Sequence, residues 1–529
     1  MNKVKFINLL LLLIISQSAL SQQADILIKN GRIVDGTGNS WYNADVAISN
    51  GKIIYIGKSK NIIAVKTIDA KGLIIAPGFI DVHTHIEGEE SKNPTANNFI
   101  LDGVTTVVTG NCGSSAEDVQ KYFRYLDSLK LSINVATLIG HNTVRREVMG
   151  TANRLPTQDE LKQMETLVAK AMKGGAVGLS TGLIYIPGTY SRTPEIVALA
   201  KVAAQYNGLY ASHMRDEADS IVQAINEAIA VGMQANIPVE ISHFKVSGQQ
   251  NWGRSKQTLQ MIKDARQNGL EITIDQYPYT ASSTSLSTMI PDELLADGND
   301  SIKARLQRPD VRNYTIDYML RKLKNRKLKH FSYAVVASHR ADSTYNGKSI
   351  EEINLMKGRK HKAKDEAETV IDLMLNGGAG MVFHGMSEND VKNIMQYPYN
   401  MFASDAGIRQ YKQGVPHPRG YGTNARVLGK YVREEKIISL EEAIRRMTSL
   451  PAQKFQLKDR GLLKEGMAAD IVLFDEKEIK DMATFEDPHQ YAKGFKYVIV
   501  NGRMVVENGN HTGVRSGAVL PGPGINKIL

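Results

Sequence analysis

Two histidines separated by one residue, His83 and His85, are the first feature of the sequence that could carry chemistry. They end the strand-like run IAPGFIDVHTH. Residues i and i+2 of a strand point to the same side, so both imidazoles can face one point. Two convergent histidines at the carboxyl end of a barrel strand form half of a metal site. The spacing alone is a weak signal, because such pairs also occur in structural positions.

Further residues with metal-binding side chains end other β-rich runs, and they are Cys112, His213, His243 and Asp405. Each of them alone would more often be structural. Together with the histidine pair they supply imidazole, thiolate and carboxylate groups, which are the ligand types of a zinc centre. His141 and His384 also end apolar runs and are weaker candidates.

The elements that must position these residues alternate between strand and helix signals over about residues 77–450. Such alternation predicts an α/β fold with a parallel sheet and helical crossovers, most economically a distorted (β/α)8 barrel. Ten strand-like runs compete for eight places, and the surplus runs are 331–338 and 380–385. We interpret residues 283–345 as an insertion over the barrel mouth.

Strand–Asn-Gly–strand units occur near both ends of the chain. Two lie around Asn30-Gly31 and Asn50-Gly51, and another lies within residues 497–509. Asn-Gly supplies the positive φ of a type I′ hairpin turn. We therefore expect hairpins there, and a small β-sandwich domain assembled from residues 24–76 and 451–529.

The N-terminus has the pattern of a secretory signal peptide: a basic start, the apolar run Leu9–Ile15 and then small residues. The pattern predicts a signal peptide over residues 1–21 and export, with the periplasm as the expected destination and no membrane anchor after processing. The chain has one cysteine, so the exported protein must fold without an internal disulfide.

Composition and charge narrow the class of protein. The 529 residues are 42% apolar and 23% charged, which fits a globular chain and excludes disorder, collagen and coiled coil. The net charge of +10 is concentrated in residues 301–330, which hold ten Lys or Arg against two acidic residues. We interpret this segment as a solvated helix face and expect no nucleic-acid partner.

Longer motifs around the candidate ligands resemble those of the N-acyl-D-amino-acid deacylases, or D-aminoacylases, of the amidohydrolase superfamily. The resemblance extends from about residue 24 to the C-terminus. The motifs are HTH at 83–85, GVTTVVTGNCG at 103–113, GAVGLSTGLIYIPG at 175–188, YASHMRDE at 210–217, ISHFK at 241–245, DQYPY at 275–279, ASDAG at 403–407 and HPRGYGTNARVLG at 417–429.

This resemblance implies a zinc-binding site in the barrel. Cys112, His213 and His243 would form a tight Zn²⁺ site. A second, weaker metal position would be formed by His83, His85 and Asp405. The segment GLSTGL contains no lysine that could be carboxylated to bridge two metals, so a bridging Cys112 thiolate is expected.

The resemblance also implies a reaction: hydrolysis of N-acyl-D-amino acids by metal-activated water, with Asp405 as general base and then general acid. Lys245, Tyr277 and Arg419 would bind the substrate α-carboxylate, with Tyr279 as the alternative to Tyr277. Hydrolysis of D-residue-containing dipeptides is a close alternative. Hydrolysis of cyclic amides, as by dihydropyrimidinases or dihydroorotases, and a metal-free binding module are more distant ones.

Overall fold

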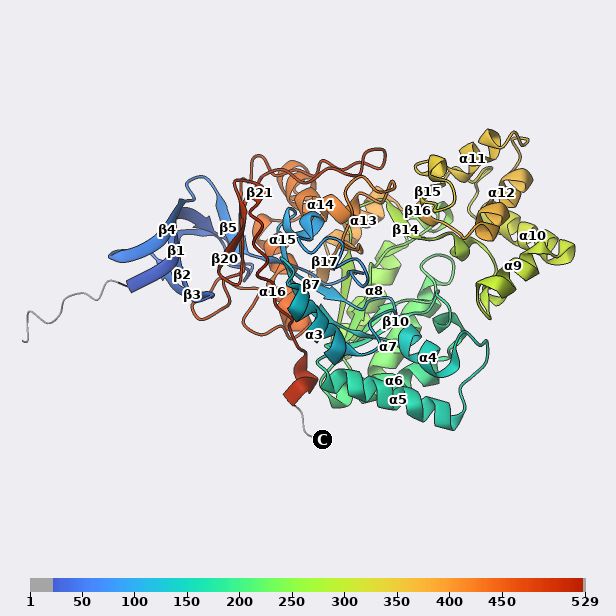
Figure 1. Cartoon of the computed structure of the whole chain (residues 1–529), viewed down its shortest axis with the longest axis horizontal. Coiled ribbons are helices and arrows are strands. Elements are labelled where there is room, and N and C mark those ends of the chain that lie inside the picture. Colours follow the sequence, from blue (N-terminus) through green and yellow to red (C-terminus); the bar gives the residue numbers. More distant parts are fainter. Residues whose placement is uncertain (1–21, 527–529) are drawn as a thin grey trace, which may run out of the picture.

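The computed structural model describes residues 22–526, so the predicted signal peptide lies outside the described residues. Figure 1 shows three parts along the long axis: a β-sheet domain at one end, a central barrel, and an insertion at the other end. Among the described helices, none is long and apolar enough to cross a membrane.

The barrel has eight strand positions, all running parallel. Backbone hydrogen bonds join its two hydrogen-bonded sheets at both seams: Val177 N–H donates to Thr137 O and Asp405 N–H donates to His83 O, each at 2.9 Å. The strands are β6 (Phe79–Asp81), β7 (Val104–Thr109), β8 (Asn134–Thr137) continued by β9 (Ile139–Gly140), β10 (Gly178–Gly182), β11 (Leu209–His213), β12 (Val239–Ile241), β13 (Ile272–Gln276) and β17 (Asn400–Phe402).

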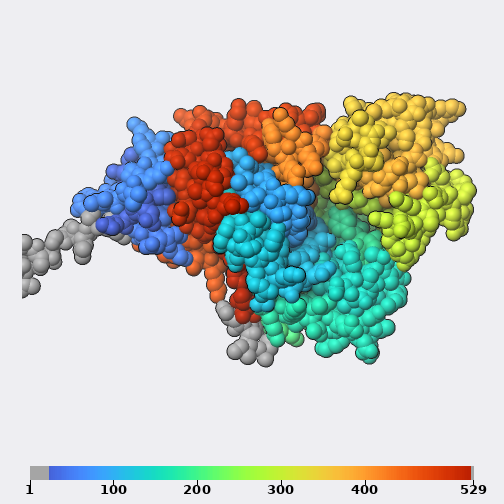
Figure 2. All heavy atoms as spheres, in the orientation of Figure 1, coloured from blue at the N-terminus to red at the C-terminus, as the bar shows by residue number. Residues whose placement is uncertain are grey.

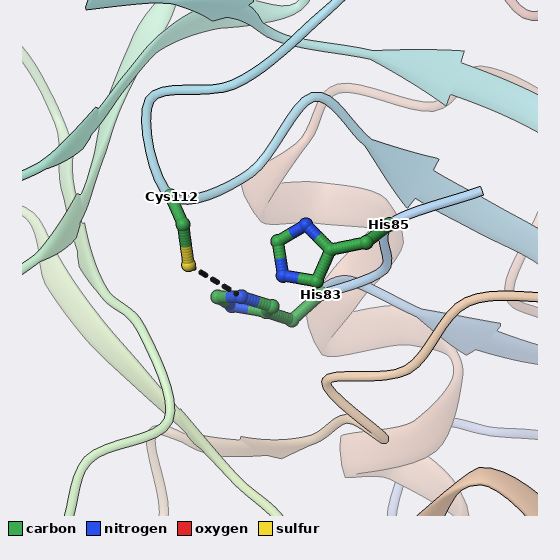
Figure 3. Close-up of side chains that lie close together, drawn as sticks. All are labelled: His83, His85 and Cys112. Carbon is green, nitrogen blue, oxygen red and sulfur yellow. Dashed lines mark hydrogen bonds between the residues drawn. The ribbon is translucent and has the colours of Figure 1, made fainter. Parts of the chain in front are cut away.

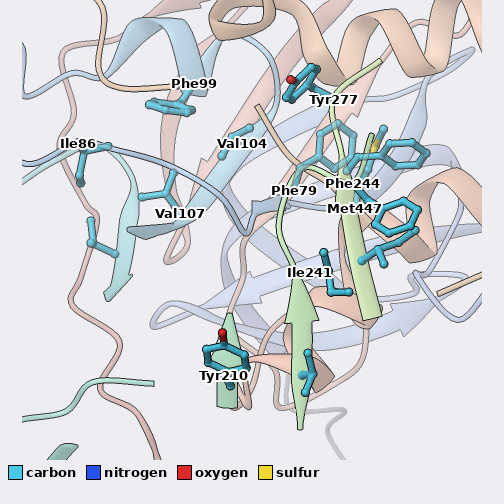
Figure 4. Close-up of a cluster of buried hydrophobic side chains, with 14 of the residues drawn as sticks. Phe79, Ile86, Phe99, Val104, Val107, Tyr210, Ile241, Phe244, Tyr277 and Met447 are labelled. Carbon is cyan, nitrogen blue, oxygen red and sulfur yellow. The ribbon is translucent and has the colours of Figure 1, made fainter. Parts of the chain in front are cut away.

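Helices cover the barrel, and α7 shows why. Its buried residues Ile221, Ile225 and Ala228 follow helical spacing, so one face packs inward. Buried side chains of the same core, among them Phe79 and Ile241, appear in Figure 4. The helices are α2 (Asn97–Ile100), α3 (Val119–Leu129), α4 (His141–Met149), α5 (Gln158–Lys173), α6 (Thr193–Gln205), α7 (Ile221–Ala235), α8 (Ser255–Gln267), α13 (Glu388–Met395), α14 (Arg419–Arg426), α15 (Leu440–Met447) and α16 (Ser449–Lys454).

Both ends of the chain build the β-sheet domain, as predicted. Strand β18 from the C-terminal part pairs antiparallel with β5 from the N-terminal part, and all nine strands belong to one hydrogen-bonded sheet. Figure 2 shows the two terminal segments in contact. The strands are β1 (Gln22–Ile33), β2 (Tyr42–Ser49), β3 (Lys52–Gly57), β4 (Ile62–Asp69), β5 (Ile74–Pro77), β18 (Ile471–Phe474), β19 (Phe495–Val500), β20 (Arg503–Glu507) and β21 (Asn510–His511).

Three of the four Asn-Gly pairs in these units form the expected hairpin turns: 50–51 between β2 and β3, 501–502 between β19 and β20, and 508–509 between β20 and β21. The prediction for Asn30-Gly31 is wrong, because β1 continues through this pair. A shift of register against β2 between Ile28 and Gly31 marks a β-bulge there. The positive φ of Asn30, 62°, serves a bulge as well as a turn, so the dipeptide alone could not distinguish them.

The insertion has its own sheet and its own apolar core. Its antiparallel strands follow the order β14-β16-β15, and the two surplus runs of the sequence are β15 and β16. The insertion therefore extends past the expected limit at residue 345, to residue 384. Its elements are β14 (Ala281–Ser285), α9 (Asn299–Gln307), α10 (Pro309–Asn325), β15 (Ala334–Ser338), α11 (Ile350–Met356), α12 (Ala363–Leu375) and β16 (Gly380–His384).

Candidate active site

The barrel brings all six predicted metal ligands to one end. They lie at or just beyond the carboxyl ends of the strands: His83 and His85 after β6, Cys112 after β7, His213 at the end of β11, His243 after β12 and Asp405 after β17. Figure 3 shows His83, His85 and Cys112 side by side, with their polar atoms turned toward one another.

Three buried side chains form the group predicted as the tight site. The Cys112 Sγ atom lies 3.4 Å from His213 Nδ1 and 3.6 Å from His243 Nε2. The two nitrogens are 2.8 Å apart. In a tetrahedral zinc centre with Zn–S and Zn–N bonds of about 2.3 and 2.1 Å, the ligand atoms lie about 3.4–3.6 Å apart. The two sulfur–nitrogen distances match this spacing, and the two nitrogens lie closer together. One thiolate and two imidazoles therefore fit a zinc ion in type and converge closely enough to ligate one.

The second predicted group adjoins the first through the cysteine. His83 Nε2 lies 3.2 Å from Cys112 Sγ and 3.6 Å from Asp405 Oδ1. His85 Nε2 lies 3.2 Å from the same Asp405 oxygen. Cys112 thus stands between the two groups, where its thiolate can be shared.

Backbone conformation turns several of these side chains into the site. Cys112, His243 and Asp405 have positive φ values of 52°, 36° and 50°. Residues other than glycine rarely adopt this region, and each such residue costs of the order of 1 kcal/mol or more. Three of them at one site indicate that the fold stabilises a strained arrangement of the ligands.

The local charges keep the two anionic side chains ionised. Burial raises the pKa of the Cys112 thiol, but the neighbouring His83 and His213 outweigh it and hold this pKa well below its usual value. Burial likewise raises the pKa of Asp405, yet Arg419 and His83 hold it well below the ordinary range. Both groups are therefore anions, the form in which they ligate metals.

Two carboxylates that the sequence analysis did not single out orient the histidines. Glu217 Oε1 lies 2.9 Å from His243 Nδ1 and accepts a hydrogen bond from Lys245 Nζ at 2.6 Å. Asp275 Oδ2 lies 3.4 Å from His83 Nδ1. Carboxylates in this position fix the tautomer and orientation of metal-binding histidines. Both residues belong to quoted motifs, YASHMRDE and DQYPY, but nothing in the spacing distinguished them.

The predicted substrate-binding residues lie together beside Asp405. The Tyr277 ring has Lys245 Nζ 5.5 Å and Arg419 Cζ 4.5 Å from its centroid. All three side chains are buried, and the Tyr277 hydroxyl makes no hydrogen bond to any described residue. Arg419 Nη1 lies 2.8 Å from Asp405 Oδ2.

The alternative tyrosine and the weaker histidine candidates have other surroundings. The Tyr279 ring packs against the rings of His417 and Phe485, centroids 5.2 and 6.3 Å apart. His141 Nε2 contacts Glu195 at 2.8 Å in a buried network, and the ring of His384 packs against Phe485. These contacts assign His141 and His384 structural positions.

A cavity of about 1060 Å³ opens onto the ligands His85, Cys112 and Asp405. The insertion supplies part of its wall, at residues 337–340. Its charged lining is mostly basic: Lys92, Arg340, Arg409, Lys412 and Arg419 against Glu89 and Asp405. The cavity therefore suits a small anionic molecule.

A barrel that gathers histidines and a carboxylate at the ends of its strands is the architecture of a metal-dependent hydrolase. The family model described as "Amidohydrolase family" matches residues 66–283 and 367–506, which leaves out most of the insertion. A D-hydantoinase of known structure shares the fold, with a TM-score of 0.56 and 17% identity over 94% of this chain and 98% of that one.

Proteins that are more similar to this chain than the D-hydantoinase is identify its family within the amidohydrolases. A D-aminoacylase from Alcaligenes xylosoxydans xylosoxydans is 34% identical over 94% of this chain and 98% of its own. The structure of an N-acyl-D-glutamate deacylase from Bordetella bronchiseptica, complexed with zinc and a phosphonate inhibitor, has a TM-score of 0.81 and 34% identity, covering 94% of this chain and all of that one. The chain therefore belongs to the N-acyl-D-amino-acid deacylase, or D-aminoacylase, family of the amidohydrolases.

Proposed function

We propose that this protein hydrolyses the amide bond of N-acyl-D-amino acids, releasing a D-amino acid and a carboxylate. The observation that carries the proposal is the convergence of Cys112, His213 and His243 with Asp405 and Arg419, beside a cavity that Cys112, Asp405 and Arg419 line. Support comes from relatives named D-aminoacylase, N-acyl-D-glutamate deacylase and N-acyl-D-aspartate deacylase, each 34% identical to this chain.

Zinc is the proposed cofactor. Cys112, His213 and His243 would hold one Zn²⁺ tightly, and His83, His85 and Asp405, which meet at Asp405 Oδ1, would hold a second more weakly. When bound, the metal supplies Lewis acidity and a nucleophile at neutral pH. Support for two positions comes from a D-aminoacylase described as having a binuclear metal centre, with one-metal activation and second-metal attenuation.

Asp405 is the proposed proton carrier. Its ionised carboxylate accepts a proton from the attacking water and delivers it to the departing nitrogen, which could not leave as an amine anion. In the free protein Arg419 pairs with Asp405 at 2.8 Å. A substrate α-carboxylate would compete for this guanidinium and release the Asp405 oxygen for proton transfer.

Selection of the D-enantiomer follows from fixing two groups of the substrate at once. Arg419 and Lys245 supply positive charge for the α-carboxylate, and the unpaired hydroxyl of Tyr277 supplies a hydrogen bond. The scissile amide must meanwhile lie at the metal ligands. With both ends fixed, the substituent on Cα has one productive direction, and only one enantiomer can place it there.

The experiment is amine release from paired N-acetyl-D- and N-acetyl-L-amino acids by zinc-loaded protein. The panel pairs neutral with acidic side chains, and it includes D-dipeptides and cyclic amides. D-selective release that Asp405→Asn abolishes would support the proposal. Release from cyclic amides alone, or L-selective release, would overturn it.

The proposal includes export to the periplasm, on the strength of the signal-peptide pattern in residues 1–21. Fractionation of cells that express the full chain tests it. The expected result is protein in the periplasmic fraction whose N-terminus begins at Gln22. Full-length protein in the cytoplasm would contradict it.

A further inference from the structure

A second group of metal-ligating side chains lies in the insertion, outside the barrel. Its four members are contributed by the segment before β15, by α11, by the segment between α11 and α12, and by α12: His330, Glu351, His361 and Glu366. One ligand atom from each lies within 4.8 Å of the others. The deacylation chemistry uses none of them, so their convergence needs its own explanation.

The contacts within this group are those of a closed set of ligands. His330 Nδ1 lies 2.6 Å from Glu366 Oε1 and 3.9 Å from Glu351 Oε1. His361 Nε2 lies 2.5 Å from the same Glu351 oxygen. The two imidazole rings are stacked, with centroids 4.1 Å apart. The rings of the barrel ligands His213 and His243 approach about as closely, with centroids 4.3 Å apart.

The charges around the group also favour a cation. The insertion is strongly basic, and several of its carboxylates pair with arginine or lysine, as Asp372 does with Arg312 and Arg359. Glu351 and Glu366 differ, because the ion pairs that the described residues form with them involve only histidines. Two carboxylates would neutralise the charge of a divalent ion.

One side of the group is buried and fixed in position, and the other side is open to solvent. The Glu366 side chain is fully buried, and its second oxygen accepts a hydrogen bond of 2.7 Å from the backbone N–H of Phe331. This bond fixes the carboxylate and leaves Oε1 turned toward His330. The side chains of His330 and His361 are 29% and 52% exposed, so an ion can reach them from solvent.

We propose that His330, Glu351, His361 and Glu366 form a structural Zn²⁺ site, separate from the catalytic centre. Two imidazoles and two carboxylates are borderline and hard donors suited to zinc, and four protein ligands close the tetrahedral coordination that structural zinc prefers. The ion would cross-link α11, α12 and the segment before β15. It would thereby stabilise the insertion that lines the active-site cavity.

Zinc stoichiometry of the full chain tests this proposal independently of any activity. Wild type and His330→Ala/His361→Ala are dialysed against buffered zinc, each also in a Cys112→Ala background that removes the shared thiolate of the barrel site. His384→Ala, an exposed histidine of the same insertion, is the matched control. Circular dichroism establishes that each variant is folded.

The double variant should bind one zinc equivalent fewer than wild type in both backgrounds, and His384→Ala should bind as many as wild type. In the Cys112→Ala background, zinc should raise Tm, and the double variant should lose this rise. Cobalt bound in that background should show d–d absorption without the charge-transfer band of a thiolate. Equal zinc content in the folded double variant and wild type would overturn the proposal.

A second variant guards against unfolding of the double substitution. Glu351→Gln keeps the size and hydrogen-bonding capacity of the side chain but removes one charged ligand. Zinc affinity at the insertion site should fall at least tenfold in the Cys112→Ala background. Unchanged affinity would show that the group consists only of histidine–glutamate contacts.

Discussion

Asp405 is the residue on which the proposed chemistry depends most directly. Asp405→Asn should lower kcat by about 10²- to 10⁴-fold, because an amide cannot accept and return the proton. Zinc bound by Cys112, His213 and His243 should remain, since none of these changes. Steady-state kinetics and metal analysis measure the two effects. A kcat within a few-fold of wild type would assign the proton transfer to another group.

Glu217 holds a metal ligand and a substrate-binding residue in place at once. Glu217→Gln should lower zinc affinity about 10- to 100-fold, because His243 loses its carboxylate partner. KM should rise as well, because Lys245 loses its 2.6 Å hydrogen bond to the carboxylate. The control is Glu227→Gln, which removes a carboxylate that is as little exposed as Glu217 and pairs with Arg215. Glu227→Gln should keep the zinc affinity and KM of wild type. If Glu217→Gln keeps them as well, Glu217 has no positioning role.

Among individual residues, the metal-binding side chains could be predicted from the sequence, while the groups that surround them could not. His83 and His85 follow the period of a strand, which places both on one side. Asp275 touches His83 only because β13 and β6 end at the same side of the barrel. The positive φ values of Cys112 and His243 likewise depend on tertiary packing rather than on residue type.

Helix α16 carries a buried lysine whose titration is a test of the packing. Burial lowers the pKa of Lys454 to about 8, while in the unfolded chain it is about 10.4. Between pH 8 and about 10.4 the unfolded chain binds more protons at Lys454 than the folded chain does. The contribution of Lys454 to the free energy of unfolding therefore rises with pH in this range. The Tm of wild type should therefore rise relative to that of Lys454→Met between pH 8 and 10.

Other titrating groups are common to both proteins, so the difference in Tm isolates Lys454. Lys458→Met, at an exposed lysine four residues away, should show no such trend. A constant difference between wild type and Lys454→Met across this pH range would mean that the Lys454 amino group is not desolvated.

Elements were predictable where a local signal has one structural meaning. The alternation of strands and helices identified the barrel, but the helical pattern of α11 and α12 is the same whether they cover a barrel or a separate core. The limit of the insertion therefore depended on β16 pairing with β14, a contact about 100 residues apart in sequence. The prediction of a hairpin turn at Asn30-Gly31 was wrong for the same reason: the strands that pair with this segment decide whether it forms a bulge or a turn.

For the whole molecule, the sequence showed that similar β units at both ends belong together, and the pairing of β18 with β5 confirms it. It did not show which basic residues face the active site. The cluster at 301–330 lies mainly on α9 and α10 of the insertion, where Arg305 pairs with Asp297 and Arg312 with Glu368. The cavity draws its positive charge from elsewhere, from residues such as Arg340 and Lys412.

This charge distribution predicts how the enzyme should respond to salt. Basic side chains around the cavity raise the local concentration of an anionic substrate, and salt screens this attraction over about 10 Å at 0.1 M. Added NaCl should therefore lower kcat/KM several-fold and leave kcat unchanged. Arg340→Gln should flatten the dependence, because it removes a charge from the cavity wall, whereas Lys303→Gln on α9 serves as the control. A kcat/KM that does not change with salt would mean that the substrate is held by contacts within the site alone.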